Sequence, residues 1–269
     1  MRGVVVGPGV MGELIGKAWH EVFPDGELIF LGKGGERPRL LAERYGGRAT
    51  YAVTETPPAD WIFLTLKPQT AARVLPTLRP LVLSHSVILS VMTGISLAYL
   101  RKGLKHGRLV RAMPNTPGQI GAGLSVCKAE GLTEHEHGLA QRLLSALGEV
   151  IWVEEERYID MATALSGTGP AYVFLFMEAL IDAGVHMGLP RHLAEKMVVA
   201  TLQGSVRYYK VAQKSIATLR HEVTSPGGTT AEAIYRLEKA GFRPALSRAV
   251  WAAYQRALSL SPDTAEEAQ

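Results

Sequence analysis

The run from Ser225 to Thr230 reads Ser-Pro-Gly-Gly-Thr-Thr and leads directly into a helix-like segment. Two successive glycines let a ligand approach the backbone, and the first turn of a helix has N–H groups without intrahelical partners. This junction could therefore hold a carboxylate or a phosphate. Thr229 and Glu232 fit a capping box, which predicts Thr229 as the N-cap and puts the Thr230 hydroxyl at the mouth of the pocket. The alternative is an ordinary helix entry that binds nothing, since the same residue types begin many helices.

A second glycine loop lies near the start of the chain, where Gly7-Pro8-Gly9-Val10-Met11-Gly12 follows a short apolar run. In this G-x-G-x-x-G pattern, Gly7 permits a tight turn and Gly9 lets the backbone approach a pyrophosphate. Gly12 lets the helix pack close to the strand, and the helix N-terminus supplies N–H groups. Because the pattern follows a strand-like segment and opens a helix, it predicts a dinucleotide-binding loop rather than a plain glycine turn.

The residues after the second strand-like segment indicate which dinucleotide binds. An NAD-binding loop usually has an acidic residue at this strand end, where it accepts hydrogen bonds from the free ribose hydroxyls. Here the strand ends without one, and Lys33 and Arg37 could instead meet a 2′-phosphate. The sequence therefore favours NADP(H), although Glu36 lies close enough that use of NAD(H) stays open.

The elements that must position these loops follow a regular order. Up to about residue 153, strand-like and helix-like segments alternate, which predicts a parallel sheet with crossover helices. The strands are expected at Gly3–Val6, Leu28–Leu31, Trp61–Leu66, Val87–Val91, Leu109–Met113, Gly123–Cys127 and Val150–Val153. The helices between them are expected at Glu13–Val22, Pro38–Tyr45, Thr70–Leu78, Leu97–Leu104 and Glu134–Leu147.

After Glu154 the strand-like runs stop and only helix-like segments follow, before a polar tail at Ser261–Gln269 that is expected to fray. These helices are expected at Tyr158–Leu165, Ala171–Met187, Arg191–Tyr209, Ser215–His221, Thr230–Ala240 and Arg243–Leu260. The predicted fold is an α/β Rossmann-like N-terminal domain, residues 1–154, followed by an all-α C-terminal domain, residues 155–269. The second domain has many apolar faces, so we expect at least a dimer. Those faces include Ile181, Val185, Met197, Val198, Leu202 and Val206.

The composition is that of a soluble globular protein, with 47% hydrophobic and 20% charged residues. The apolar stretches Trp61–Leu66 and Ala171–Ile181 are too short for a membrane span or are interrupted by Glu178, and no signal-peptide pattern follows Met1. Cys127 is the only cysteine, which excludes an internal disulfide and agrees with a reducing compartment. The net charge is only +4 and the basic residues are scattered. We therefore expect a cytoplasmic protein that binds neither membrane nor nucleic acid.

Three further segments, taken with the two glycine loops, resemble the Δ1-pyrroline-5-carboxylate reductase family. They are Leu66-Lys67-Pro68, the run from Arg111 to Pro117 and the run from Ala164 to Tyr172. Ser225–Thr230 matches that family's C-terminal motif, and Gly188-Leu189-Pro190-Arg191 also fits its pattern. The resemblance covers almost the whole chain in the right order. It implies an NADP-binding Rossmann-like domain and a helical substrate and dimerisation domain that interlocks with a second subunit, with each active site between the domains.

The resemblance also implies roles for individual residues. The expected cofactor contacts are Gly7, Gly9, Val10, Met11, Gly12, Lys33, Leu66, Lys67, Pro68, Thr93 and Asn115. The expected substrate contacts are Ser166, Gly227, Gly228, Thr229 and Thr230. The backbone N–H groups of Gly227, Gly228 and Thr229 would bind the carboxylate. Thr230 would bind the ring nitrogen and is the one expected catalytic residue. Two positions depart from the family pattern. Thr168 replaces a frequent serine, and Glu222 replaces an amide, which puts a cofactor contact at that position in doubt.

The implied reaction moves a hydride from C4 of the nicotinamide of NAD(P)H to the cyclic C=N bond of 1-pyrroline-5-carboxylate and gives L-proline, the last step of proline biosynthesis. A protonated imine is already electrophilic, so positioning and electrostatics can carry most of the rate enhancement. Thr230 would orient the nitrogen and could relay a proton through water. The proton donor itself, the exact oligomer size and activity on six-membered cyclic imine acids are not predicted by the sequence.

Two other functions remain as alternatives. A β-hydroxyacid dehydrogenase shares the glycine loop and the order of domains, but its catalytic lysine would fall at Val173, and no lysine lies between Arg157 and Arg191. A non-catalytic NADP(H)-binding regulator would not need the Ser225–Thr230 pocket. No metal is expected, because the histidines of Glu134–His137 are two residues apart and so lie on different faces of a helix.

Overall fold

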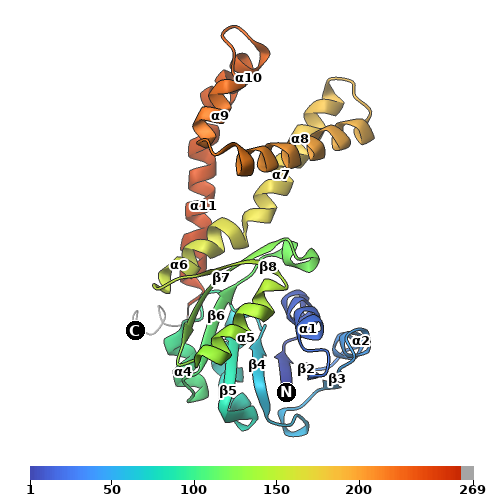
Figure 1. Cartoon of the computed structure of the whole chain (residues 1–269), viewed down its shortest axis with the longest axis vertical. Helices are drawn as coiled ribbons and strands as arrows, with labels where there is room; N and C mark the ends of the chain where they lie inside the picture. Colours follow the sequence, from blue (N-terminus) through green and yellow to red (C-terminus); the bar gives the residue numbers. More distant parts are fainter. Residues whose placement is uncertain (262–269) are drawn as a thin grey trace. The chain divides into compact units, whose positions relative to one another are not determined.

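The computed structural model describes residues 1–261 and divides into two compact units (Figure 1). The first unit comprises Met1–Gly169 and the chain from Ala252 onward, and the second comprises Pro170–Trp251. All but the first residue of the expected frayed tail lies outside the described residues. Each unit has a different architecture, a sheet with helices in the first and helices alone in the second, as the sequence predicts.

The first unit contains a sheet with the strand order β3-β2-β1-β4-β5-β6-β7-β8. The strands are β1 (Arg2–Val6), β2 (Glu27–Leu31), β3 (Arg48–Thr50), β4 (Ala59–Leu64), β5 (Val82–Ser90), β6 (Leu109–Met113), β7 (Gly123–Glu130) and β8 (Gly148–Trp152). Strands β1 to β6 are parallel, β7 runs antiparallel to β6, and β8 is parallel to β7. The strand order reverses at β1, which lies between β2 and β4, and this is the place where sheets of this kind bind ligands.

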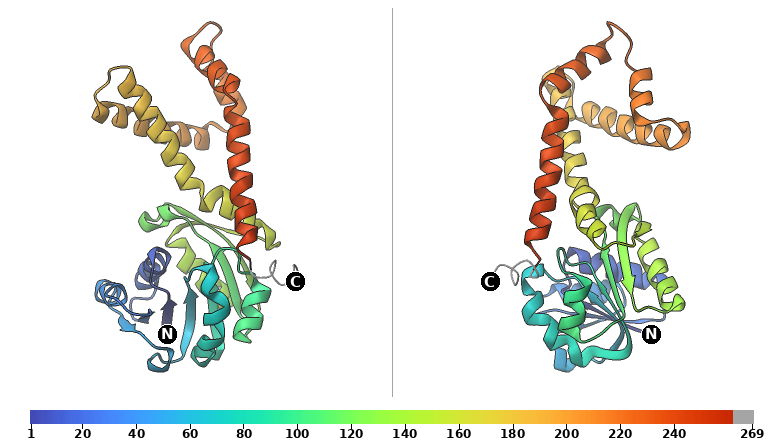
Figure 2. Two further views of the ribbon diagram at one scale, coloured as in Figure 1. Left: turned by 180° about the vertical axis from the view of Figure 1, so that it is seen from behind. Right: turned by 90° about the vertical axis from the view of Figure 1, so that its left-hand side faces the viewer.

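Helices cover both faces of this sheet, as two of the views show (Figure 2). Val5 packs in the core formed with α1 (Val10–Val22), α2 (Arg37–Arg44) and α5 (Glu134–Ser145), whereas Val4 and Val6 pack in the core formed with α3 (Ala71–Val74) and α4 (Leu97–Leu104). A strand that is buried on both faces needs a continuous apolar run rather than alternation, which explains Val4-Val5-Val6.

Three local features of this unit differ from the sequence prediction. The short strand β3 was not predicted, because Arg48-Ala49-Thr50 carries no apolar run. The sheet is parallel as predicted except at one pair of strands, because β7 runs antiparallel to β6. The predicted helix Thr70–Leu78 is instead a series of short helical turns from Pro68 to Leu81, because Pro76 and Pro80 lack the N–H groups that a continuous helix needs.

The compact units do not coincide with the expected division at residues 154 and 155. Helix α6 (Arg157–Ala162) and the π-helical turn η5 (Thr163–Gly167) belong to the first unit. Ile159 of α6 is fully buried against Met113 of β6 and Val126 of β7. This apolar contact anchors the start of the helical region to the sheet.

The second unit is built from α7 (Gly169–His186), α8 (Arg191–Ala212), α9 (Ile216–Glu222), α10 (Thr229–Lys239) and the first part of α11 (Phe242–Ser259). Helices α7 and α8 touch closely at one point, where a Cβ added to Gly184 would lie 3.0 Å from Cβ of Ala194. In this unit only these two small residues are buried. Large apolar side chains such as Phe174 and Leu175 are more than 60% exposed, so the unit has almost no core of its own.

Candidate functional site

The N-terminal glycine loop has the backbone conformation that its sequence predicts. Gly7 follows β1 with a φ of +89°, a region that favours glycine, and its N–H donates to Leu31 O at 3.0 Å. A Cβ at Gly12 would lie 3.0 Å from Gly7 O and 3.1 Å from Val5 Cγ1, so glycine is needed for α1 to pack against the strand. At Gly9 a Cβ would meet only Gly7 O, at 3.9 Å. The loop is therefore tight on its strand side and open at Gly9.

On the open side of the loop, backbone N–H groups lie before the first hydrogen bond of helix α1. The first intrahelical bond of α1 runs from Glu13 N to Gly9 O at 2.9 Å, so the N–H groups of Val10, Met11 and Gly12 precede it. These donors and the positive end of the helix dipole can hold a pyrophosphate. The residues present therefore fit a dinucleotide. No metal-ligating cluster of three or more side chains occurs among residues 1–261.

Thr65 supports this loop and was not identified from the sequence. Its hydroxyl lies 2.7 Å from Gly7 O and 3.0 Å from Val6 O, so it bridges the end of β4 to the end of β1. A threonine at a strand end carries no motif of its own, and only the pairing of β1 with β4 brings it to the loop.

The other predicted cofactor residues follow the carboxyl ends of neighbouring parallel strands. Leu66, Lys67 and Pro68 come after β4, Thr93 comes after β5, and Asn115 comes after β6. Because the carboxyl ends of parallel strands meet at one edge of a sheet, these loops share an edge with the glycine loop.

Asn115 connects this edge to the π-helical turn. Its Nδ2 donates to Ser166 O at 3.1 Å, and its Oδ1 accepts from Leu124 N at 2.9 Å. The Ser166 hydroxyl donates at 3.0 Å to the carbonyl oxygen of Ala162, the last residue of α6. The structure therefore gives Asn115 a supporting role for the predicted substrate residue Ser166, and π-helical turns of this kind are frequent at functional sites.

The two candidate cations for a 2′-phosphate have different surroundings. Arg37 Nε donates to Pro8 O at 2.9 Å and its Nη2 pairs with Glu13 Oε2 at 2.9 Å, so this side chain braces the glycine loop. Lys33 is exposed, and within residues 1–261 it has no ion-pair partner. Lys33 is thus the cation that is free to bind an anion.

The Ser225–Thr230 segment forms a turn followed by α10. Pro226 precedes Gly227, which has a φ of +70°, and Gly228 N donates to Ser225 O at 3.1 Å, the arrangement of a type II turn. A Cβ at Gly228 would lie 2.6 Å from Ser225 Oγ and 3.2 Å from Ser225 O, so the turn also requires a small residue there.

The predicted capping box is wrong. The N-cap is Gly228 with extended backbone, the helix begins at Thr229, and no side chain caps it. Glu232 pairs instead with Arg236 one turn later, at 2.7 Å. The tight turn at Gly227 brings the chain into helical conformation one residue earlier than the threonine pattern predicts.

This shift changes which backbone donors the loop offers. The first intrahelical bond of α10 runs from Glu232 N to Gly228 O at 3.3 Å, so the N–H groups of Thr229 and Thr230 precede it. The N–H of Gly228 is used within the turn. Of the three predicted carboxylate donors, Gly227 and Thr229 remain available in this conformation.

Several other side chains have structural partners. Glu222 pairs with Lys214 at 2.6 Å, and that hydrogen bond and charge raise the pKa of Lys214. His137 lies against Trp152 with ring centroids 4.2 Å apart, which supports a structural role in the Glu134–His137 segment. Cys127 is fully buried in β7, and burial raises the pKa of its thiol well above the ordinary value.

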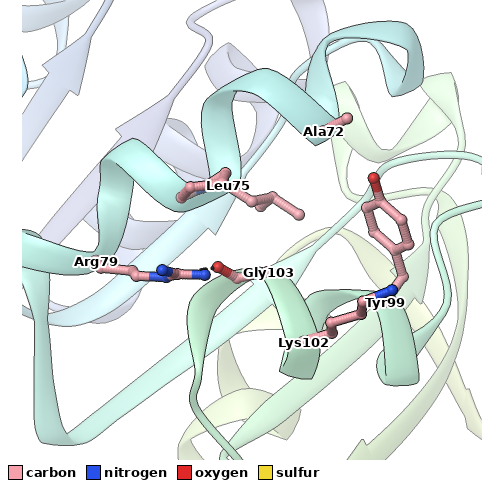
Figure 3. A pocket seen from close by; sticks show the side chains of 7 residues that line it. Ala72, Leu75, Arg79, Tyr99, Lys102 and Gly103 are labelled. Carbon is pink, nitrogen blue, oxygen red and sulfur yellow. Dashed lines mark hydrogen bonds between the residues drawn. The ribbon is translucent and has the colours of Figure 1, made fainter.

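Two hollows lie apart from the predicted site residues. One, of about 200 Å³, opens between the α3 region and α4, with Leu75, Arg79 and Tyr99 around it (Figure 3). The other is an apolar groove of about 1080 Å³ within the second unit, on α7, α8 and α11. Its lining includes Leu175, Phe176, Leu202, Val206, Phe242 and Leu246.

The matching family model and the curated relatives point to one family. A family model described as pyrroline-5-carboxylate reductase dimerisation matches residues 156–260. The pyrroline-5-carboxylate reductase of Synechocystis sp. is 37% identical over 265 residues, which cover 95% of this chain and 97% of that protein.

Two solved structures with the same family name are also similar to this chain. A pyrroline-5-carboxylate reductase from Coxiella burnetii is 32% identical with a TM-score of 0.82, over 96% of this chain and 98% of that one. The Plasmodium falciparum pyrroline carboxylate reductase, solved with NADP bound, is 28% identical with a TM-score of 0.87, over 97% of this chain and 98% of that one.

Proposed function

Because the chain belongs to the pyrroline-5-carboxylate reductase family, we propose how its own residues carry out that family's reaction. The protein is an oxidoreductase that reduces 1-pyrroline-5-carboxylate to L-proline with NAD(P)H. The observation that carries this function is the 37% identity over nearly the whole chain, in a protein whose glycine loop has the conformation of a nucleotide-binding loop. The direct test is whether the purified chain oxidises NADPH when the cyclic imine is added and forms proline.

The cofactor is proposed to bind at the carboxyl edge of the sheet. The N–H groups of Val10, Met11 and Gly12 hold the pyrophosphate, and the Leu66–Pro68 loop, Thr93 and Asn115 border the ribose and nicotinamide. When bound, NADPH supplies a hydride from C4 of its nicotinamide ring. The chain's part is to hold the acceptor carbon in line with that position.

The substrate carboxylate is proposed to bind at the start of α10. The N–H groups of Gly227 and Thr229 donate to its oxygens, and the positive end of the helix dipole attracts its charge. The hydroxyl of Thr230 accepts a hydrogen bond from the protonated ring nitrogen and orients the C=N bond. Ser166 is proposed as a further substrate contact, on a turn of the first unit that Asn115 holds.

NADPH is proposed as the preferred cofactor, with Lys33 as the residue that selects it. Lys33→Ala is expected to raise the KM for NADPH by about tenfold, because the 2′-phosphate loses its ion pair with the lysine. The KM for NADH should change by less than about twofold. Steady-state kinetics with both cofactors measures this effect.

The matched control is Arg39→Ala, which removes an exposed cation from the neighbouring helix α2. It should leave both KM values near those of the wild type, because salt screens the charge of an exposed side chain that is not proposed to contact the cofactor. A Lys33→Ala enzyme with an unchanged ratio of the two KM values would argue against this role.

The second unit is proposed to form a homodimer through its open apolar faces, and the dimer to be the building block of any larger oligomer. Residues 156–260 match the family's dimerisation model, and the apolar groove on α7, α8 and α11 needs a cover that the second unit itself does not supply. By length and composition, Arg157–His186 could also cross a membrane. We propose that a second copy of the chain, rather than lipid, covers the apolar side chains of this segment. We also propose that the enzyme is cytoplasmic.

Leu175→Glu is expected to dissociate this dimer. The side chain is 66% exposed and lines the groove, so a charge there would be desolvated in the interface. Light scattering coupled to size exclusion should show the mass of one chain. Leu40→Glu, at an apolar side chain of the first unit that is 56% exposed, should keep the wild-type mass. A Leu175→Glu variant of wild-type mass would contradict the proposed interface.

The two alternative functions are not favoured. A dehydrogenase that removes a proton from an alcohol needs a base, and the absence of lysine between Arg157 and Arg191 leaves that role unfilled. A regulator without turnover would not oxidise NADPH in the imine assay.

A further inference from the structure

An ionic cluster around a buried arginine lies beside the proposed cofactor and substrate residues. Arg111 of β6 has a side chain only 3% exposed, and its Nη1 donates to Glu156 Oε1 at 2.8 Å. Its Nη2 pairs with Asp160 of α6, whose side chain is 15% exposed. All three residues belong to the first unit.

Glu156 also holds the segment that carries Thr93. The same Oε1 atom accepts from Leu97 N, the first residue of α4, at 2.8 Å. Thr93 and Gly94 form the turn just before this point, and Gly94 has a φ of +72°. Met92 and Ile95 on either side of the turn are buried. The carboxylate thus fixes the downstream end of the turn.

Asp160 holds the segment that carries Ser166. It lies on α6, which runs directly into the π-helical turn. Ile159, its neighbour, is fully buried against the sheet. Arg111 itself lies four residues before Asn115, which donates to Ser166 O. The guanidinium therefore joins the strand before Asn115 to the helix before Ser166.

The stability of the fold does not by itself explain why these three charged residues lie here. Burying a guanidinium and partly burying two carboxylates, whose side chains are 25% and 15% exposed, costs desolvation energy that their attraction offsets only partly. Moreover, Nε of Arg111 is buried without a hydrogen-bond partner among residues 1–261. Apolar residues of similar size would fill the space at lower cost, but they would not fix the two segments by directed hydrogen bonds.

We propose that Arg111, Glu156 and Asp160 are positioning residues for the reaction, with Glu156 setting the cofactor-side turn at Thr93 and Asp160 setting the substrate-side turn at Ser166. This inference rests on the proposed contacts of Thr93 and Ser166. Neither carboxylate is proposed to touch the reacting atoms. The cluster couples the two turns through a single guanidinium.

The two carboxylates give separable tests, because each single variant leaves Arg111 with one anionic partner. Glu156→Ala is expected to raise the KM for NADPH by about tenfold and to change the KM for the imine by less than about twofold. Asp160→Ala is expected to do the reverse, raising the KM for the imine by about tenfold at an unchanged KM for NADPH. Loss of folded enzyme alone would lower the apparent kcat and leave both KM values unchanged.

Glu130→Ala is the matched control, since it removes one partner of the exposed Arg101–Glu130 pair in the same unit. It should behave as the wild type. If either alanine variant fails to fold, Glu156→Gln and Asp160→Asn are compared in the same way, and the same opposite shifts are expected at smaller size. If the wild type is active and the variants change both KM values equally, or neither, the inference is overturned and the proposed function stands. An inactive wild type would overturn the proposed function instead.

Discussion

Thr230→Val is expected to lower kcat by about tenfold to a hundredfold, with little change in stability or in the affinity for NADPH. The substitution keeps the side-chain shape and β-branching, so α10 should form equally well. It removes the hydroxyl that is proposed to orient the ring nitrogen and relay a proton, and effects of this kind are worth about tenfold or more in rate. Single-turnover and steady-state rates with the cyclic imine measure the loss.

Thr230→Ser is the matched control, since it keeps the hydroxyl. We expect it to retain most of the turnover. Wild-type turnover in Thr230→Val would remove Thr230 from the mechanism, and an equal loss in both variants would point to the methyl group rather than the hydroxyl.

Gly9→Ala is expected to weaken NADPH binding by about tenfold or more, which corresponds to about 1.4 kcal/mol. Gly9 has a φ of −85°, which alanine adopts freely, and the added Cβ would meet no protein atom closer than 3.9 Å. The free energy of unfolding of the cofactor-free protein should fall by no more than about 1 kcal/mol, the cost of a poorer N-cap. The methyl group would instead lie on the open side of the loop, where the pyrophosphate is proposed to approach.

The control for this variant is Gly138→Ala on α5, where a Cβ would also meet nothing within 4 Å. It should leave NADPH binding unchanged and stabilise the helix slightly. Calorimetric titration with NADPH compares the two. Equal affinity in Gly9→Ala and the wild type would show that the pyrophosphate does not approach Gly9.

The fold was predictable where one physical cause dominates a segment. Helix α4 has the predicted bounds because Ser96 caps it and its apolar residues recur at helical spacing. The glycine loop was predictable because Gly7 has a positive φ and Gly12 leaves no room for a Cβ, so two of its glycines answer separate steric needs. By contrast, nothing within Arg48–Thr50 marks a strand, and the direction of β7 is decided by its pairing with β6 rather than by its own residues.

The sequence motifs indicated where the candidate site lies, but they did not indicate the residues that hold its loops in place. Thr65 and the Arg111 cluster act through partners 45 to 59 residues away, a relation that no local pattern reveals. The capping prediction failed because the turn at Gly227 sets where α10 begins, and threonine preference is too weak to override it. The roles of Gly227, Thr229 and Thr230 toward the substrate remain predictions.

Steady-state rates with pyrroline-5-carboxylate, measured with NADPH and NADH in parallel and with the product identified, test the account most directly. We expect oxidation of NADPH that depends on the imine, one proline formed for each cofactor oxidised, and a lower kcat/KM with NADH. Oxidation of neither cofactor, or a product other than proline, would contradict it.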